Sequence, residues 1–280
     1  DAKKGATMAT ARAGDVSFWY EEQGAGEPVL FLHGLTWDHT MWDAQVAALA
    51  GEYRCIALDF IGHGRTPDVD HDYSFWDLAS YVARFLDDIG VPSAHVVGLS
   101  MGGMTAMRLA LRHPGRVRSL ALLDTDAGTE DPAKAAGYHQ LGEAVIAQGW
   151  EAVADAVAAV LFGAPYLERS EHRAAVRAKL AANPRESIAG RALRCVTQRD
   201  DIRGQLGQIA VPTTVIVGEL DIATPPERSE EIAAAIPGAR LVRIPGAGHM
   251  SPIEAPEAVT RALREHLAAA TAAFAGSDGR

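Results

Sequence analysis

The stretch Gly98-Leu-Ser100-Met-Gly-Gly103 decides the fold of this chain. It directly follows the apolar run Ala94-His-Val-Val-Gly98 and precedes a helical pattern that begins near Met101. A sharp turn from a strand into a helix forces its central residue into strained backbone angles, and the flanking positions need glycine because a Cβ there would collide with the strand or the helix. The sequence therefore predicts a strand-turn-helix unit that presents the Ser100 hydroxyl above the end of a sheet.

A serine hydroxyl is a weak nucleophile near neutral pH and needs a base that is oriented by a third group. Asp221 follows the strand pattern 213–218, and His249 follows the strand pattern 240–244. Taken alone, each would be an ordinary loop residue. Loops at the carboxyl ends of parallel strands converge on one crevice, so the chain order serine, acid, histidine favours a catalytic triad of Ser100, Asp221 and His249.

Short β-branched runs alternate with longer helical patterns along most of the chain, which is typical of a mostly parallel, doubly wound α/β sheet. The expected strands are 16–22, 28–33, 54–59, 94–98, 117–124, 213–218 and 240–244. The expected helices of this layer are 41–50, 74–90, 101–113, 226–236 and 256–269.

From about residue 126 to residue 208 the strand pattern stops and the chain becomes Ala-rich and helical. Helices are expected at 132–148, 150–161, 167–182 and 187–199. An all-helical insertion inside a β/α alternation indicates a lid. The expected organisation is a core of residues 14–125 and 209–270, a helical lid of residues 126–208 that follows the strand ending near Asp124, and flexible ends at 1–13 and 271–280.

Composition excludes several classes of protein. The chain has 280 residues, of which 48% are hydrophobic, enough for one large core. A net charge of −10 argues against nucleic acid and anionic membrane surfaces as partners. No segment approaches the roughly 18 apolar residues that would span a membrane, so we expect a soluble cytoplasmic protein. Its oligomeric state is open.

Cysteine and histidine spacing predicts no metal site. The two cysteines, Cys55 and Cys195, lie in apolar surroundings and are expected to be buried, reduced thiols. The histidines outside the triad show no pair on one helical face with a partnering carboxylate. We therefore expect neither a metal nor a cofactor.

From about Val16 to Leu267 the chain resembles the α/β-hydrolase superfamily. Besides the stretch around Ser100, the resemblance is carried by His33-Gly-Leu-Thr36, Asp59-Phe-Ile-Gly-His-Gly-Arg-Thr66 and Gly248-His249. It implies that His33 is structural, that Asp59 orders the turn after its strand, and that the backbone N–H groups of Leu35 and Met101 form the oxyanion hole. Asp124 is the alternative triad acid, since some family members draw the acid from that strand end.

The stretches 100–104 and 248–257 are similar to the branch with 3-oxoadipate enol-lactonases, cofactor-free haloperoxidases (perhydrolases) and related carboxylesterases. This resemblance implies a serine hydrolase that cleaves a small-molecule carboxylic ester or lactone through an acyl-enzyme on Ser100. Trp37 and Trp150 are candidate substrate-pocket residues. Two alternatives stay open: the same triad used for C–C hydrolysis, perhydrolysis or hydroxynitrile lysis, or a catalytically slow ligand-binding receptor.

Overall fold

A single mixed sheet forms the centre of the molecule. The computed structural model describes residues 5–277, and within them eight strands lie in the order β1-β2-β4-β3-β5-β6-β7-β8. The strands are β1 (Thr7–Ala13), β2 (Val16–Gln23), β3 (Glu27–Leu32), β4 (Tyr53–Leu58), β5 (Ala94–Leu99), β6 (Val117–Leu123), β7 (Thr213–Gly218) and β8 (Arg240–Ile244). Strand β2 is antiparallel to both of its neighbours, and every other pairing is parallel. The predicted mostly parallel α/β sheet is confirmed.

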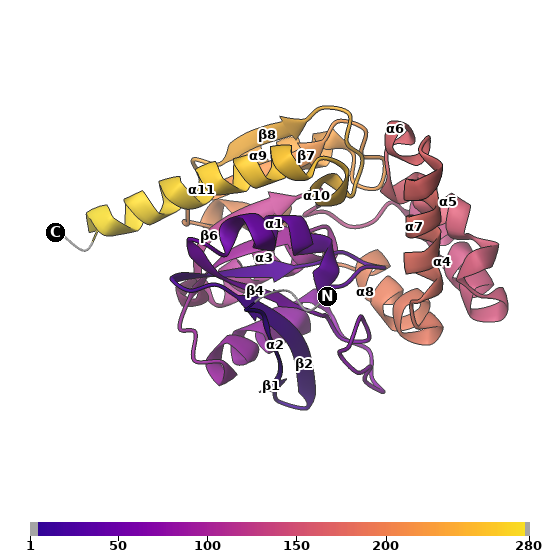
Figure 1. Ribbon diagram of the computed structural model, residues 1–280, viewed down its shortest axis with the longest axis horizontal. Helices are drawn as coiled ribbons and strands as arrows, with labels where there is room; N and C mark the ends of the chain where they lie inside the picture. The colour runs from indigo at the N-terminus through magenta and orange to yellow at the C-terminus, as the bar shows by residue number, and fades with distance from the viewer. Residues whose placement is uncertain (1–4, 278–280) are drawn as a thin grey trace.

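Helices cover both faces of this sheet. In the part of the chain that the structure describes they are η1 (His39–Trp42), α1 (Asp43–Leu49), α2 (Phe75–Asp88), α3 (Met101–Arg112), η2 (Pro114–Arg116), α4 (Pro132–Gln148), η3 (Trp150–Ala152), α5 (Ala154–Leu161), α6 (Ala164–Leu167), α7 (Ser170–Ala181), η4 (Glu186–Ala192), α8 (Leu193–Thr197), η5 (Arg203–Gln208), α9 (Pro226–Ala235), α10 (Ser251–Glu254) and α11 (Pro256–Ser277). Helices α2, α3 and α9 pack on one face, and α1 and α11 pack on the other. Helices α4 to α8 gather at one side of the molecule (Figure 1).

The central strands β3, β5, β6 and β7 are largely apolar and buried because both faces of the sheet are covered there. In β3, Leu30 and Leu32 join the core under α2 and α3, whereas Val29 and Phe31 join the core under α1 and α11. Successive side chains of a strand point to opposite faces, so a strand between two helical layers reads as a continuous hydrophobic run. This pattern made the central strands predictable.

The first strand was not predicted. Residues 1–13 were expected to be a flexible end, but Thr7–Ala13 pairs with β2 along its whole length, from Thr7 opposite Glu22 to Ala13 opposite Val16. A two-residue Gly14-Asp15 turn joins the two strands, and Gly14 has a positive φ of 74° that suits such a hairpin. The inward side chains are small alanines, which produce little hydrophobic signal. Residues 1–4 lie outside the described residues.

The last helix is longer than expected. Residues 271–280 were predicted to be a flexible end, yet α11 continues to Ser277, and residues 278–280 lie outside the described residues. Alanine is the strongest helix former, and the Ala-rich run from Ala268 to Ala275 contains neither glycine nor proline. None of the described helices, α11 included, is long and apolar enough to cross a membrane.

Both cysteines are buried and unbridged, as expected. Burial raises the pKa of the Cys55 and Cys195 thiols to about 12. The thiolate is the reactive form of cysteine, so these side chains behave as small core residues.

A cluster of buried polar side chains joins α11 to the sheet near the amino ends of β5, β6 and β7. His266 contacts the Thr214 hydroxyl at 3.0 Å and the Ser119 hydroxyl at 2.9 Å, and Ser119 also contacts His95 at 2.8 Å. Burial, together with the nearby His95 and Arg240, lowers the pKa of His266 to about 4. His266 is therefore neutral in the folded protein at pH values where it would be charged in the unfolded chain.

We expect the free energy of unfolding to fall as the pH drops from about 6.5 towards 4. In that window the unfolded chain binds a proton at His266 that the folded protein does not. The resulting loss in the free energy of unfolding is on the order of 3 kcal/mol across the whole window. Urea unfolding at a series of pH values should give a shallower dependence for His266→Gln than for the wild type. The exposed His71→Gln is the matched control, and equal slopes for His266→Gln and wild type would contradict the assignment.

Candidate active site

Ser100 stands at a strained turn between β5 and α3. Its φ of 53° and ψ of −114° lie outside the ordinary helical and strand regions. The backbone around it is held from both sides, because the Ser100 N–H donates to the Leu123 carbonyl at 2.9 Å and the Thr125 hydroxyl donates to the Ser100 carbonyl at 2.8 Å. Strain of this kind persists only where the surroundings impose it, and it is found mostly at functional sites.

The glycines around Ser100 are required by close backbone approaches. A Cβ on Gly98 would lie 2.5 Å from the Gly102 carbonyl carbon, and a Cβ on Gly102 would lie 2.1 Å from the Leu32 carbonyl oxygen. Helix α3 can therefore start directly against β3 and β5. The predicted strand-turn-helix unit is present, and it places Ser100 at the first turn of a helix whose N–H groups have no acceptor within the helix.

Asp221 and His249 meet through a direct hydrogen bond. Because a carboxylate only accepts, His249 Nδ1–H is the donor, to Asp221 Oδ2 at 2.9 Å, which leaves Nε2 as the free basic nitrogen. Asp221 Oδ1 accepts the N–H groups of Ala223 and Thr224 at 2.8 and 2.9 Å, and the Thr224 hydroxyl donates to Oδ2 at 2.8 Å. The carboxylate is thus fixed in one orientation. The Thr224 contact is not among the site contacts expected from the sequence.

Asp124, the alternative acid, bonds to partners other than His249 in the described residues. It is fully buried at the end of β6, where it accepts the Gly218 N–H at 2.8 Å and the Ser251 hydroxyl. Burial and the neighbouring Asp221 carboxylate raise the pKa of Asp124 well above its usual range. These contacts connect the ends of β6 and β7 to the start of α10, so Asp124 supports the two loops that carry Asp221 and His249.

The loop after β3 runs beside Ser100. A Cβ on Gly34 would meet the Leu99 side chain at 2.9 Å and the Ser100 Cβ at 3.5 Å. Leu35, the next residue, lines the same cavity as Ser100. Met101 is the first residue of α3, and its side chain packs in the core. The two residues expected to donate oxyanion N–H groups therefore lie on segments that adjoin Ser100.

Ser100 and His249 open into one cavity of about 110 Å³. One wall comes from strand-end loops, and the other comes from the helical segment between β6 and β7. The side chains of that second wall are largely apolar and include Leu141, Val145, Trp150, Val157, Val160, Leu161, Ile188, Leu193 and Val196. Among the described residues that line the cavity there is no lysine or arginine, and Glu130 is the acidic member. The cavity therefore suits an uncharged, apolar group.

The two tryptophans proposed for the pocket take different positions. Trp150 lines the cavity and donates its indole N–H to the Asn183 carbonyl at 2.9 Å. Trp37 packs instead against the Phe162 ring, with 5.8 Å between ring centroids, and it is not among the described residues that line the cavity. Asn183 also donates to the Thr36 carbonyl at 2.8 Å, which links the helical segment to the loop after β3.

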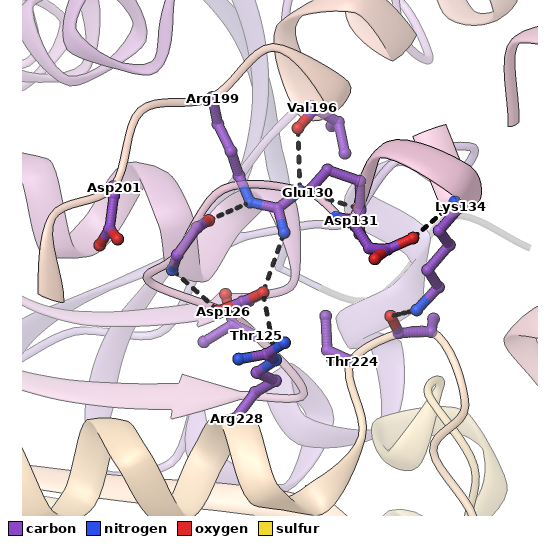
Figure 2. A network of polar contacts seen from close by, with 12 residues as sticks. Thr125, Asp126, Glu130, Asp131, Lys134, Val196, Arg199, Asp201, Thr224 and Arg228 are labelled. Carbon is purple, nitrogen blue, oxygen red and sulfur yellow. Dashed lines mark hydrogen bonds and ion pairs between the residues drawn. The ribbon is translucent and has the colours of Figure 1, made fainter. Parts of the chain in front are cut away.

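Polar contacts anchor the helical segment beside the Asp221 loop (Figure 2). The buried Arg199 guanidinium pairs with Asp126 at 2.9 Å and with Glu130 at 2.9 Å. Glu130, which lines the cavity, is therefore paired with a cation. Lys134 of α4 donates to the carbonyls of Ile222 and Ala223, which follow Asp221. The start of the helical segment is thus fixed to the loop that carries the acid.

The described residues contain one group with metal-ligand geometry, formed by Asp38, His39 and Asp59. Its atoms already have partners, since Asp59 Oδ1 accepts both the N–H and the ring Nδ1–H of His39 at 2.8 Å and Asp38 pairs with Lys179. Asp59 Oδ2 also accepts the Arg65 N–H at 2.9 Å. This pattern fits the expected structural role of Asp59, which orders the loop after β4.

Most of the sheet and the candidate site lie within a match to a known protein family. The α/β hydrolase fold family matches residues 27–256, which include the Ser100 turn and the Asp221 and His249 loops. The chain belongs to the α/β-hydrolase family. The resemblance expected from the Ser100 and His249 motifs is therefore confirmed.

Relatives of this α/β hydrolase include lactonases and esterases. The chain is 32% identical to 3-oxoadipate enol-lactonase 1 of Acinetobacter baylyi over 82% of its length and 84% of that protein. It matches the structure of a thermophilic esterase from Thermogutta terrifontis with a TM-score of 0.87 and 31% identity, covering 94% of this chain and 99% of that one. It matches the enol-lactonase from Burkholderia xenovorans LB400 with a TM-score of 0.86 and 30% identity, covering 93% and 100%.

Proposed function

We propose that this hydrolase cleaves carboxylic esters or lactones through an acyl-enzyme on Ser100. The observation that carries the proposal is the Asp221–His249 hydrogen bond, which occupies Nδ1 and leaves Nε2 as the free nitrogen of a histidine that lines the same cavity as Ser100. The similarity to esterases and enol-lactonases supports the class of bond.

The reaction begins when His249 Nε2 takes the Ser100 hydroxyl proton and the serine oxygen bonds to the substrate carbonyl carbon. The N–H groups of Leu35 and Met101 hold the oxyanion that forms, and each such donor contributes roughly 3–4 kcal/mol to lowering the barrier. The tetrahedral intermediate collapses, and the alkoxide leaves with the proton from His249. Water then attacks the acyl-enzyme with His249 again as base, and Ser100 is released with the acid product.

The helical segment 126–208 acts as a lid whose apolar wall receives the acyl group. Each buried methylene contributes about 0.8 kcal/mol, so kcat/KM should rise about fourfold per carbon until the cavity is filled. An acyl chain with a terminal carboxylate should be rejected, because the wall is largely apolar and the described lining residues offer no lysine or arginine to pair with the charge.

The test is a panel of p-nitrophenyl esters from acetyl to octanoyl, together with neutral γ- and δ-lactones followed by acid release. The decisive pair is the 4-methylpentanoyl ester and the hemisuccinate ester, which have similar shapes but differ in charge. We expect the neutral ester to be preferred at least about a hundredfold in kcat/KM. Preference for the hemisuccinate would refute the apolar acyl site, and no turnover across the whole panel would refute the hydrolase assignment.

A further inference from the structure

The Glu254 carboxylate connects the His249 loop to the helical segment. Its Oε2 accepts the N–H groups of Gly163 at 2.8 Å and Gly248 at 3.0 Å, and its Oε1 accepts the N–H of Met250 at 3.1 Å. Gly248 and Met250 flank His249, whereas Gly163 follows α5 in the helical segment. One side chain therefore holds the backbone on both sides of the histidine and a backbone amide of the opposite wall.

The two backbones are in direct contact at this point. The Met250 N–H also donates to the Leu161 carbonyl at 3.0 Å. A Cβ on Gly248 would lie 2.4 Å from the Gly163 nitrogen, so a side chain there would separate the two segments. Glycine at 248 is thus what allows both segments to reach the same carboxylate.

The carboxylate and the amides depend on each other. Burial raises the pKa of the Glu254 carboxyl, and the three amides act against this shift by stabilising its charged form. Hydrogen bonds to an ionised acceptor are stronger than neutral ones, and a buried N–H that loses its acceptor keeps its full desolvation penalty. Withdrawal of the Gly163 amide would therefore also weaken the support of the His249 loop.

We propose that Glu254 is a positioning residue that couples the base to the helical segment, holding His249 in place while residues 161–163 are docked against its loop. The inference rests on the proposed function, because it takes His249 to be the base. When the segment moves away to admit or release a substrate, the His249 loop loses the Leu161 carbonyl and the Gly163 end of the Glu254 bridge. The base is then aligned only in the closed molecule.

A substitution at position 163 can remove the hydrogen bond that the helical segment makes to Glu254. Gly163 has φ −62° and ψ 145°, and the preceding Phe162 has φ −121° and ψ 143°, angles that proline and the residue before it adopt readily. Gly163→Pro therefore replaces the N–H that reaches Glu254 by a ring carbon at backbone angles that proline adopts. Gly163→Ala is its matched control, since it keeps the N–H and adds the same Cβ, which would lie 3.1 Å from Glu254 Oε2 and 3.3 Å from the Gly248 nitrogen in both variants.

We expect Gly163→Pro to lower kcat for a p-nitrophenyl ester at least tenfold relative to Gly163→Ala, with KM changed less than threefold. The rate of labelling by a fluorophosphonate, which needs an aligned base but no substrate, should fall by the same factor. A role limited to folding would lower the melting temperature and leave both rates of the folded enzyme unchanged. Equal rates for the proline and alanine variants would overturn the proposal.

The bridge can also be cut at the carboxylate. In Glu254→Gln the charge is lost and one acceptor oxygen becomes an NH₂ donor that faces backbone N–H groups. At the Oε2 position this NH₂ would leave the Gly163 and Gly248 amides without their acceptor, and at the Oε1 position it would leave the Met250 amide only the Leu161 carbonyl. We expect a similar loss of kcat, whereas Glu257→Gln on the exposed side of α11 should match the wild type. If Glu254→Gln lowers kcat but Gly163→Pro does not, Glu254 supports only the His249 loop, and the proposed coupling to the helical segment is overturned. If circular dichroism shows that Glu254→Gln is unfolded, the pair at position 163 decides alone.

Amide hydrogen exchange separates failure of this coupling from failure of the proposed function. If the wild type neither hydrolyses esters nor reacts with the fluorophosphonate, the proposed function fails. Exchange at Gly248 and Met250 still tests the bridge, because it should be at least tenfold faster in Gly163→Pro than in Gly163→Ala. Unchanged exchange in that pair would overturn the coupling whatever the activity.

Discussion

Replacing Ser100 by alanine is expected to lower kcat for a neutral p-nitrophenyl ester by at least about 10⁴-fold, since loss of the nucleophile removes the acyl-enzyme route. The positive φ at position 100 is imposed by the surrounding backbone, so alanine takes over the same strained turn. The melting temperature should therefore stay close to that of the wild type. Kinetics and thermal unfolding on the same preparation check both parts.

A fluorophosphonate provides the second readout for this variant. The wild type should be labelled on Ser100, which mass spectrometry of the digested protein locates, and Ser100→Ala should not be labelled. Ser170→Ala, at an exposed serine that begins α7, is the control and should behave as the wild type. Turnover retained in Ser100→Ala would remove the serine from the reaction.

Replacing Asp221 by asparagine is expected to reduce kcat by about 10³- to 10⁴-fold. The two backbone N–H groups on Oδ1 favour an asparagine that keeps its carbonyl oxygen there. Its NH₂ group then faces His249 Nδ1, which must accept, so the proton moves to Nε2 and the base is lost. The pre-steady-state acylation rate reports this step most directly.

Asp124→Asn is the matched comparison at the neighbouring strand end. Burial and Asp221 favour the protonated form of Asp124, which resembles asparagine in shape and charge. The amide can still accept the Gly218 N–H and reach the Ser251 hydroxyl. We expect a loss of less than about tenfold in kcat from this change. A larger loss for Asp124→Asn than for Asp221→Asn would exchange the proposed roles of the two acids.

Local patterns made most of this fold and much of the candidate site predictable. The apolar central strands follow from a sheet covered on both faces, and the glycines around Ser100 follow from backbone approaches within one turn. The capping box of Ser74 and Asp77 likewise starts α2 at Phe75, next to the expected start at residue 74. In each case the residues that decide the structure are neighbours in the chain.

The parts that escaped prediction depend on contacts between distant residues or on weak patterns. Strand β1 is stabilised by pairing with β2 and presents only small side chains to the core. The sequence favoured Asp221 over Asp124 as the acid, but the partners of the two carboxylates, Gly218 for Asp124 and His249 for Asp221, lie far from at least one of them in the chain. The bridge from Glu254 to Gly163 joins segments that lie far apart in the sequence, so no local motif indicates it.

The helical segment leaves the sheet after β6 and returns to it at β7, and near its two ends the Ile202 N–H donates to the Ala127 carbonyl at 2.9 Å. Its entry and exit are therefore close in space, as in an appended module. Such an insertion can diverge, lengthen or be exchanged between homologues without disturbing the register of the sheet. Chimaeras that keep Gly163, Lys134 and Arg199 as docking points offer a way to change acyl selectivity while the sheet and the proposed triad of Ser100, Asp221 and His249 stay unchanged.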